Sequence, residues 1–214
     1  MTVAPSRQAR AREQAALARE RMLDAAEEAF GRSGYRETSL RQIADAAGLS
    51  VGALYLHLDG KEELLRAVLD RRSDVLMRTI RAFVEADGPG IDRLAGLASA
   101  EVEFYRTHRD FDLVMWRLFS AGMTTLTRLS EDIAQGYTTV MRLEAELVRQ
   151  GQRDGTVRAG DAEALARLLA ALVGAYRAIG RDAPTVAGAA QDCPRLPESD
   201  FTDIVRRAFA SDPG

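Results

Sequence analysis

Cysteine and histidine are scarce in this sequence of 214 residues. Cys193 is the only cysteine, and His57 and His108 are the only histidines. These residues exclude an intramolecular disulfide, a CxxC pair and a zinc quartet of Cys and His ligands. The absence of disulfides is typical of an intracellular protein.

Long hydrophobic runs are missing as well. The N-terminal residues lack the apolar segment of a signal peptide. The least polar stretch, residues 168–176, is far shorter than the roughly 20 residues that a bilayer-spanning helix needs. We therefore expect a cytoplasmic protein that has no membrane segment.

Neither sign of charge is in large excess. The chain has 29 Lys and Arg residues against 32 Asp and Glu residues, a formal net charge of −3, and Lys61 is its only lysine. Arginine is abundant together with alanine, which indicates codon bias more than a nucleic-acid partner. The total charge neither indicates nor excludes DNA binding. Whether the protein binds DNA must therefore be judged from the positions of its charged residues.

Proline occurs at only six positions, and residues 6–88 and 90–183 contain none. Both segments are rich in Ala, Leu, Arg and Glu, which favour helix, and neither shows the period-two alternation of β-branched residues that is typical of strands. The sequence therefore predicts an all-α fold, with a long loop over residues 181–197. Helices are expected at residues 20–33, 39–46, 50–57, 61–86, 91–106, 110–121, 124–151, 161–180 and 198–210.

Residues 39–57 fit two short helices joined by a tight turn. Gly48 lies where the chain leaves the first helix, a position that favours a left-handed backbone, and Ser50 can cap the second helix. The pattern predicts either a helix-turn-helix, whose second helix can lie in the DNA major groove, or a tight helical hairpin within a core. Tyr55 can hydrogen-bond to phosphate and Gly52 permits close approach of the backbone to DNA, which favours the helix-turn-helix.

Several motifs follow one another at fixed spacings between residues 20 and 70. They are Met22-Leu-Asp-Ala-Ala-Glu-Glu-Ala-Phe30, Gly34-Tyr35, Thr38-Ser39, Ile43-Ala44-Asp-Ala-Ala-Gly48-Leu-Ser50, Gly52-Ala-Leu-Tyr55-Leu-His57 and Lys61-Glu-Glu-Leu-Leu65. This series strongly resembles the DNA-binding domain of TetR-family transcriptional regulators. The resemblance implies an N-terminal three-helix helix-turn-helix domain and a larger helical domain that binds a ligand and forms a dimer.

The resemblance also implies which side chains meet DNA. Phosphate contacts are implied for Thr38, Tyr55, His57 and Lys61, and contacts in the groove for Arg41, Ser50, Val51, Gly52 and Leu56. Val51 stands where many members of the family have Lys or Arg, so Arg41 is the best candidate for a hydrogen bond to guanine. Two alternatives stay open: Tyr55 as a purely packing residue, and Lys61 as a solvated residue at the start of helix 61–86.

In this interpretation residues 1–19 form a basic arm, followed by a DNA-binding domain over residues 20–66 and a helical domain over residues 67–214. Residues 1–21 hold five arginines and two glutamates, a local charge of +3. Such an arm either reaches an adjacent minor groove or is a frayed, solvated extension of the first helix.

Apolar residues recur at helical spacing in helices 161–180 and 198–210, which predicts one buried stripe on each helix. Two such helices suit a two-fold four-helix dimer interface, which the family resemblance also implies. The residues expected at that interface are Leu165, Leu168, Leu172, Tyr176, Phe201, Ile204, Val205 and Phe209. A homodimer would present two recognition helices to a roughly palindromic operator.

Large and adaptable side chains gather in the middle helices and at Tyr176, which predicts either a ligand cavity or a well-packed core. As a set they favour a small lipophilic or aromatic ligand over a sugar or a nucleotide. The expected ligand-binding residues are Phe104, Tyr105, His108, Met115, Trp116, Phe119, Met123, Tyr137, Met141 and Tyr176. His108 is alternatively a cap or a surface residue at a helix break.

Motifs of catalysis and cofactor binding are absent: the chain has no HExxH, GxSxG, P-loop or GxGxxG sequence. We therefore expect no enzymatic activity and no cofactor, and an all-helical protein-binding module is the competing hypothesis. The predicted function is that of a dimeric, sequence-specific repressor of transcription. A small molecule that enters the cavity would shift helix 61–86 and release the repressor from its DNA operator.

Overall fold

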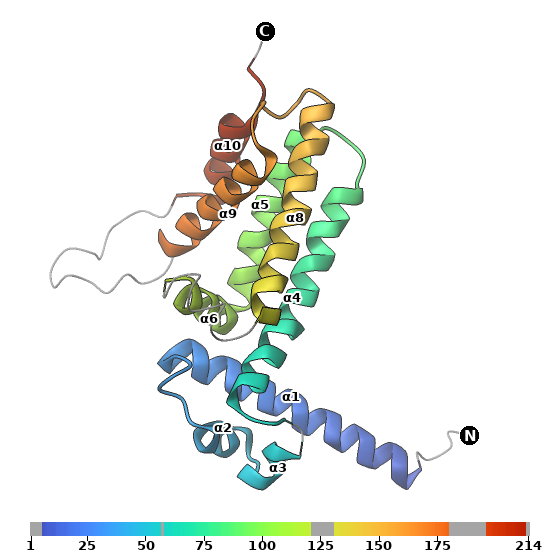
Figure 1. The fold of residues 1–214 in the computed structure, drawn as a ribbon, viewed down its shortest axis with the longest axis vertical. Coiled ribbons are helices and arrows are strands. Elements are labelled where there is room, and N and C mark those ends of the chain that lie inside the picture. The colour runs from blue at the N-terminus through green and yellow to red at the C-terminus, as the bar shows by residue number, and fades with distance from the viewer. Residues whose placement is uncertain (1–5, 57, 121–130, 180–195, 213–214) are drawn as a thin grey trace, which may run out of the picture. The chain divides into compact units, whose positions relative to one another are not determined.

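The computed structural model describes residues 6–56, 58–120, 131–179 and 196–212, which are helical apart from short connections (Figure 1). Within these ranges the only β-type pairing is one isolated antiparallel bridge between Val157 and Ala210. The prediction of an all-α fold is confirmed. The helices are α1 (Arg7–Ser33), α2 (Leu40–Ala47), α3 (Val51–Tyr55), α4 (Lys61–Glu85), α5 (Gly90–Thr107), α6 (Arg109–Ser120), α8 (Glu131–Arg153), α9 (Ala162–Ile179) and α10 (Glu198–Phe209).

Some expectations concern residues outside the described ranges. These are His57, Met123, the first residues of the helix expected at 124–151 and most of the loop expected at 181–197. Among the helices that are described, none is long and apolar enough to cross a bilayer.

Two compact units make up the chain. The N-terminal unit contains α1, α2, α3, α4 up to Ser73, and α6, and the C-terminal unit contains the rest of α4, α5, most of α8, α9 and α10. The helix α4 therefore belongs to both units, and this division differs from the boundary expected at residue 66. The helix α6 joins the N-terminal unit because Arg117 donates to the carbonyl oxygens of Gly31 (2.8 Å) and Arg32 (2.7 Å) at the end of α1.

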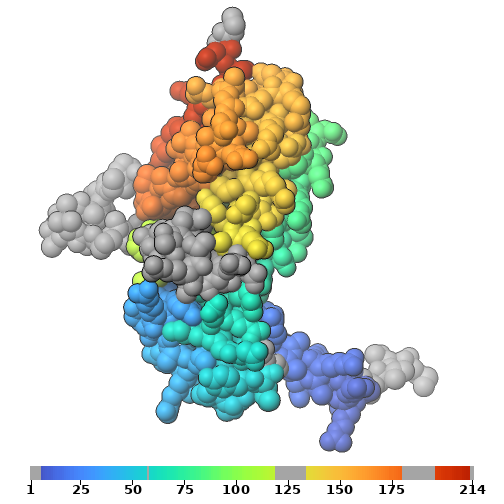
Figure 2. Space-filling view, viewed as in Figure 1, coloured from blue at the N-terminus to red at the C-terminus, as the bar shows by residue number. Residues whose placement is uncertain are grey.

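The first helix begins at Arg7 and not near residue 20. Ser6 caps it, because Ser6 Oγ accepts the N–H of Ala9 (3.1 Å). Residues 7–21 contain no Pro or Gly and are mostly strong helix formers, which explains the longer helix. These residues are exposed except for the half-buried Ala18, and Figure 2 shows this dark blue segment standing out from the rest of the N-terminal unit. From Arg7 onward the expected arm is thus the first part of α1, which agrees with the alternative of a helical extension.

Apolar side chains from five helices fill the interior of the N-terminal unit, where α1 packs against α2 and α6. The large side chains that are fully or almost fully buried are Met22, Leu23, Phe30, Ile43, Leu54, Leu64, Leu65 and Phe111. Burying a side chain of this size favours the folded state by about 1.5–3 kcal/mol. This core therefore holds α2 and α3 in place, although both helices are too short to be stable alone.

In the C-terminal unit, α5 packs against α9 and α10. Phe201, Val205 and Phe209 of α10 are almost fully buried within the same chain. The prediction that these three residues lie at a dimer interface is therefore wrong, because their side chains already pack inside one chain. Helical periodicity identified the buried stripe but not the element that covers it.

Two glycines allow close packing at the end of α8 in the C-terminal unit. A Cβ atom at Gly90, the first residue of α5, would lie 2.2 Å from Gly151 Cα near the end of α8. A Cβ atom at Gly151 would lie 2.3 Å from Val157 Cγ2. The helix α8 continues to Arg153, past its expected end at residue 151, and the carboxylate of Asp154 then accepts the N–H of Gly90 (2.7 Å). The start of α5 is thus fixed to the end of α8.

Candidate DNA-binding surface and effector site

The helix-turn-helix is built by local hydrogen bonds. Ser39 and Gln42 form a capping box at the start of α2: Ser39 Oγ accepts the N–H of Gln42 (3.2 Å), and Gln42 Oε1 accepts the N–H of Ser39 (2.8 Å). Gly48 ends α2 with φ 68° and ψ 34°, a left-handed conformation that favours glycine. Ser50 then caps α3 by accepting the N–H of Ala53 (3.1 Å). The turn predicted from Gly48 and Ser50 is confirmed.

Three of the residues predicted to meet DNA are open to solvent. Leu54 is fully buried, whereas Tyr55 is 55% exposed and Leu56 is 83% exposed at the end of α3. Arg41 on α2 is also exposed, and its guanidinium lies 4.0 Å from the carboxylate of Asp45. The exposure of Tyr55 does not fit a purely packing role. An exposed arginine, tyrosine and apolar side chain on a helix-turn-helix suit contacts with base edges and phosphates.

The other groove candidates are also at least partly exposed. Ser50 and Gly52 are exposed and Val51 is half-buried. Ser50 accepts a hydrogen bond in its cap, so its hydroxyl proton can still be donated to a phosphate oxygen. We call the set formed by Arg41, Ser50, Val51, Gly52, Tyr55 and Leu56 the recognition edge.

Thr38 and Lys61 hold the turn before α2. Thr38 is 3% exposed, and its hydroxyl donates to the carbonyl oxygen of Gly34 (2.8 Å). The predicted phosphate contact of the Thr38 side chain is therefore wrong, because its hydroxyl is buried and engaged. Lys61 Nζ donates to the carbonyl oxygen of Thr38 (3.0 Å) and lies 4.6 Å from the centre of the Tyr35 ring. Lys61 thus ties the start of α4 to this turn, a role that neither of its two predicted alternatives anticipated.

A buried carboxylate joins α1 to α4 in the N-terminal unit. Glu27 is 3% exposed and accepts hydrogen bonds from Arg71 and, through both of its oxygens, from Arg72 Nε (3.1 and 3.0 Å). Arg71 also donates to Asp24 (2.8 Å) and Glu20 (3.1 Å). These contacts fix the N-terminal half of α4 against α1. No role was predicted for Glu27 or for its two arginine partners.

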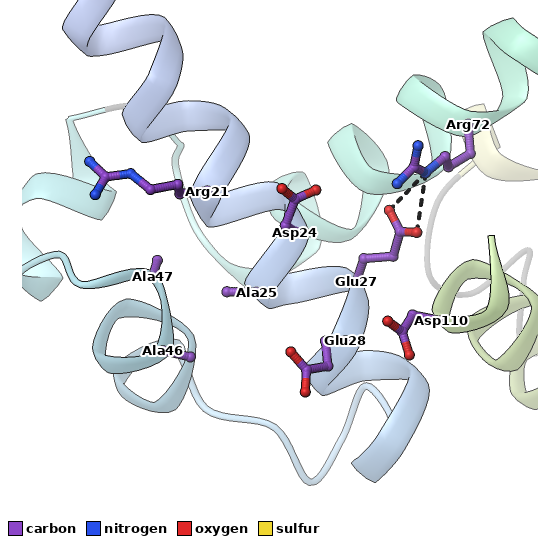
Figure 3. A pocket seen from close by; sticks show the side chains of 9 residues that line it. All are labelled: Arg21, Asp24, Ala25, Glu27, Glu28, Ala46, Ala47, Arg72 and Asp110. Carbon is purple, nitrogen blue, oxygen red and sulfur yellow. Dashed lines mark hydrogen bonds and ion pairs between the residues drawn. The ribbon is translucent and has the colours of Figure 1, made fainter. Parts of the chain in front are cut away.

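An open hollow of about 390 Å³ lies on the surface of the N-terminal unit beside these ion pairs (Figure 3). Its lining residues are Arg21, Asp24, Ala25, Glu27, Glu28, Ala46, Ala47, Arg72 and Asp110. Desolvation, together with the charge of Glu28, raises the pKa of Asp110. None of the residues predicted to bind a ligand lines this hollow.

A second buried ionisable cluster lies in the C-terminal unit, on α5, α8 and α9. Glu101 of α5 is 4% exposed, Glu144 of α8 is 1% exposed, and their carboxyl groups hydrogen-bond to each other. The guanidinium carbon of Arg177 on α9 lies 3.3 Å from the centre of the Tyr105 ring. Burial raises the pKa of Glu101 to about 7 against the opposing effect of the Arg177 charge, and burial together with the Glu101 charge raises the pKa of Glu144. Of these four residues, only Tyr105 was predicted as a site residue.

Comparison with known proteins identifies the family. Residues 22–68 match the family described as bacterial regulatory proteins, tetR family. The transcriptional regulator TtgR of Pseudomonas putida is 32% identical over 160 residues, which cover 70% of this chain and 75% of TtgR. The chain belongs to the TetR family. This TetR-family protein is therefore a helix-turn-helix transcriptional regulator and not an enzyme, as predicted.

A second relative agrees with this assignment. The transcriptional repressor KstR2 of Mycobacterium tuberculosis is 36% identical over 87 residues, which are 41% of the TetR-family chain and 44% of KstR2. This match thus spans less than half of the length of KstR2. The solved structure of KstR2 superimposes with a TM-score of 0.70 over 90% of this chain and 94% of that chain, at 23% identity. The likeness shows a shared fold, with an N-terminal helix-turn-helix domain and a helical C-terminal domain.

The residues predicted to bind a ligand are divided between the two units of this TetR-family regulator. The C-terminal unit contains Phe104, Tyr105, Tyr137, Met141 and Tyr176, and the N-terminal unit contains His108, Met115 and Trp116. The side chain of Phe119 and all of Met123 lie outside the described part of the chain.

Two of these aromatic residues have contacts or exposure that bear on their role. Tyr176 donates from its hydroxyl to the carbonyl oxygen of Leu196 (3.0 Å), and its ring stacks on Phe201 with 4.3 Å between the ring centres. Its ring therefore packs α9 against α10. Trp116 on α6 is 49% exposed.

The buried pair of Glu101 and Glu144 should make the stability of the folded chain depend on pH. Because the folded chain holds a proton on the pair up to about pH 7, whereas an ordinary glutamate titrates near 4.5, the folded state loses stability as pH rises through this window. We expect the free energy of unfolding to fall by at most about 2 kcal/mol between about pH 5.5 and 7. Urea unfolding across this range measures the slope.

The matched variants for this measurement lie on α5. Glu101→Gln removes one of the two buried titrating groups and should reduce the slope. Glu103→Gln replaces an exposed glutamate of the same helix and should leave the slope unchanged. Equal slopes in Glu101→Gln and the natural chain would contradict the assignment.

Proposed function

We propose that this regulator is a dimeric repressor that binds a roughly palindromic operator and is released by a small lipophilic or aromatic effector. The observation that carries the proposal is the exposure of the recognition edge. By contrast, Ile43, Ala44 and Leu54, which hold the motif together, are buried. A protein-binding module would need the hairpin but would not need an exposed arginine, tyrosine and glycine on its two helices. The name of KstR2 as a repressor supports repression over activation.

Arg41 is the first test of the recognition edge. Arg41→Ala should weaken binding to DNA from upstream of the protein's own gene by about tenfold, since one bidentate contact to a base contributes about 1–3 kcal/mol. Its backbone position on α2 is held by the capping box and the core, so the fold should persist. Fluorescence anisotropy with labelled duplex measures the affinity.

Arg32→Ala is the matched control for Arg41→Ala. Arg32 is an exposed arginine of the same unit whose side chain pairs only with the exposed Glu28 among the contacts of the described residues. Its loss should leave DNA affinity within about twofold. Equal losses for the two variants would mean that Arg41 acts only through total charge, and an absence of DNA binding by the natural chain would favour the protein-binding module.

The proposed dimer surface lies on α9 and α10. Leu168 is 46% exposed and Ile204 is 44% exposed, although both are large apolar residues. Leu165, Leu172 and Tyr176 are half-buried. Phe201, Val205 and Phe209 belong to the core of one chain. The proposed interface therefore consists of the other five predicted residues: Leu165, Leu168, Leu172, Tyr176 and Ile204. Burying them against a second copy would satisfy their apolar surface.

Leu168→Glu tests this surface. A carboxylate placed in a two-fold apolar interface faces its own copy or is desolvated, so the dissociation constant of the dimer should rise at least tenfold, about 1.4 kcal/mol. Sedimentation velocity over a concentration series measures the constant. Leu17→Glu, which changes a 59% exposed leucine of α1, is the control and should sediment as the natural chain does. A natural chain that is monomeric while it binds DNA would contradict the proposed dimer.

The helix α4 is the proposed link between the two functions. It runs without proline from Lys61, which is tied to the turn before α2, past Arg71 and Arg72, into the C-terminal unit. A shift of its C-terminal half by an effector would therefore act on contacts that position the helix-turn-helix. Because coupling is reciprocal, operator must weaken effector binding by the same factor by which effector weakens operator binding. An effector that binds equally well with and without operator would contradict this mechanism.

A further inference from the structure

The C-terminal unit contains a pair of carboxyl groups that is built to hold one proton. Glu101 and Glu144 are both almost fully buried and hydrogen-bond to each other across α5 and α8. Two ionised carboxylates are both acceptors, so this hydrogen bond requires a proton on one of them. The pair therefore carries a single negative charge when the site is empty.

The groups around the pair balance that charge. Arg177 from α9 acts on Glu101 and lies over the ring of Tyr105, while Tyr137 from α8 is close enough for the Glu144 charge to raise its pKa in addition to burial. Tyr105 is neutral because burial raises its pKa to about 12. With one proton on the acid pair and one positive charge on Arg177, the cluster is electrically neutral. Any further cation would make it positive unless the proton left.

One oxygen of the cluster has no hydrogen bond. Glu144 Oε2 is buried and has no partner among the described residues. Buried polar atoms are nearly always paired, so an unpaired carboxylate oxygen points to a missing group. Such an oxygen accepts hydrogen bonds or faces a positive charge. A ligand group that carries both a positive charge and N–H or polarised C–H donors satisfies it.

We propose that the effector carries a positively charged ammonium or amidinium group, and that this group binds at the Glu144 carboxylate as the proton shared with Glu101 leaves to solvent. Before binding, the cluster holds two carboxyl groups with one proton and the Arg177 cation. Afterwards it holds two carboxylates, the Arg177 cation and the ligand cation, so its net charge stays at zero. The inference rests on the proposed effector-responsive function and assigns the charge of a lipophilic or aromatic effector.

Benzyltrimethylammonium and its uncharged isostere neopentylbenzene separate charge from shape. The cation should stabilise the full-length protein against heat, with at least tenfold higher apparent affinity than the isostere. Isothermal titration calorimetry of the cation at about pH 6, in buffers of low and high ionisation enthalpy, should show roughly one proton released per chain.

Two variants assign the effect to the pair. Glu144→Gln keeps the size and a hydrogen-bonding group but removes the charge, so cation affinity should fall at least tenfold and proton release should vanish. Glu163→Gln changes an exposed glutamate of α9 and should leave both unchanged. The buffer comparison on the natural chain stands even if Glu144→Gln folds poorly. No binding of the cation, equal affinity for the two probes, or binding without proton release would each overturn the inference.

Operator release is measured separately so that the two proposals can fail independently. If the cation binds with proton release but leaves operator affinity unchanged, the site stands and the proposed regulation fails. If the uncharged isostere alone binds and releases operator, the regulation stands and the cationic effector is wrong.

Discussion

Gly90→Ala is expected to lower the free energy of unfolding by about 3 kcal/mol or more. The added Cβ would lie 2.2 Å from Gly151 Cα and 2.7 Å from Gly151 N, so it would meet the backbone of another helix and not a flexible side chain. Relief requires α5 and α8 to separate. The N–H of Gly90 also donates to Asp154 (2.7 Å), and separation would break this bond as well.

Gly136→Ala is the control for the crossing of α5 and α8. Gly136 lies within α8, and a Cβ there would have no described atom within 4 Å. Alanine should therefore stabilise the helix by about 0.5–1 kcal/mol, because glycine is the poorer helix former. Urea unfolding followed by circular dichroism measures both changes. A Gly90→Ala protein as stable as the natural chain would mean that the two helices do not meet as the structure has them.

Local backbone chemistry made the helix-turn-helix predictable from sequence. Gly48 and Ser50 act through hydrogen bonds and dihedral angles within a few residues, so their roles follow from residue type and position alone. Thr38 shows where this kind of inference ends. A threonine hydroxyl suits a phosphate as well as a carbonyl oxygen, and only the position of Gly34 in space decides between them.

The spacing of apolar residues predicted which face of a helix is buried, but not whether a helix of the same chain or a second copy covers it. Leu168 and Phe201 both fit a buried stripe, yet Leu168 is 46% exposed in one chain and Phe201 is 3% exposed. The difference depends on α5 packing against α10, a contact between residues far apart in sequence. A stripe that is covered within the chain and one left for a second copy have the same spacing.

The burial of Glu27 and Glu101 could have been predicted from their positions on the helices. Glu27 follows Leu23 by four residues and precedes Phe30 by three, so it lies on the buried stripe of α1. Glu101 lies at the same spacings between Leu97 and Phe104 on α5. A carboxylate in the middle of an apolar stripe predicts a buried partner of opposite charge or a bound proton. Which of these two applies depends on the neighbouring helix, and in this fold Glu27 meets arginines while Glu101 meets Glu144.

Glu27→Ala is expected to lower the free energy of unfolding by about 3–5 kcal/mol, since it removes one partner of a buried ion pair and leaves the other without compensation. Arg72 donates to both Glu27 oxygens, and the Arg72 side chain is only 23% exposed. Arg71 would keep Asp24 and Glu20 after the change, so the loss falls mainly on Arg72. Guanidinium unfolding at constant ionic strength measures the effect.

Glu28→Ala is the neighbouring control for Glu27→Ala. Glu28 pairs with Arg32, and both side chains are at least half exposed, so its loss should change the free energy of unfolding by about 0.5 kcal/mol or less. Similar losses for the two variants would contradict a buried anchor at Glu27. A result near zero for Glu27→Ala would mean that water replaces the carboxylate around Arg72.

The anchor at Glu27 also bears on how an effector could act. A displacement of α4 can move the helix-turn-helix only through contacts that stay intact. In the described N-terminal unit, the buried ionic contacts between α4 and α1 are the pairs of Glu27 with Arg71 and Arg72. Glu27→Gln, which keeps a hydrogen-bonding group of the same size, should therefore preserve operator binding in the absence of effector. It should reduce the factor by which effector weakens that binding, because a looser α4 transmits less of its displacement. If effector weakened operator binding by the same factor in this variant, the displacement of α4 would be transmitted through the Lys61 contacts instead.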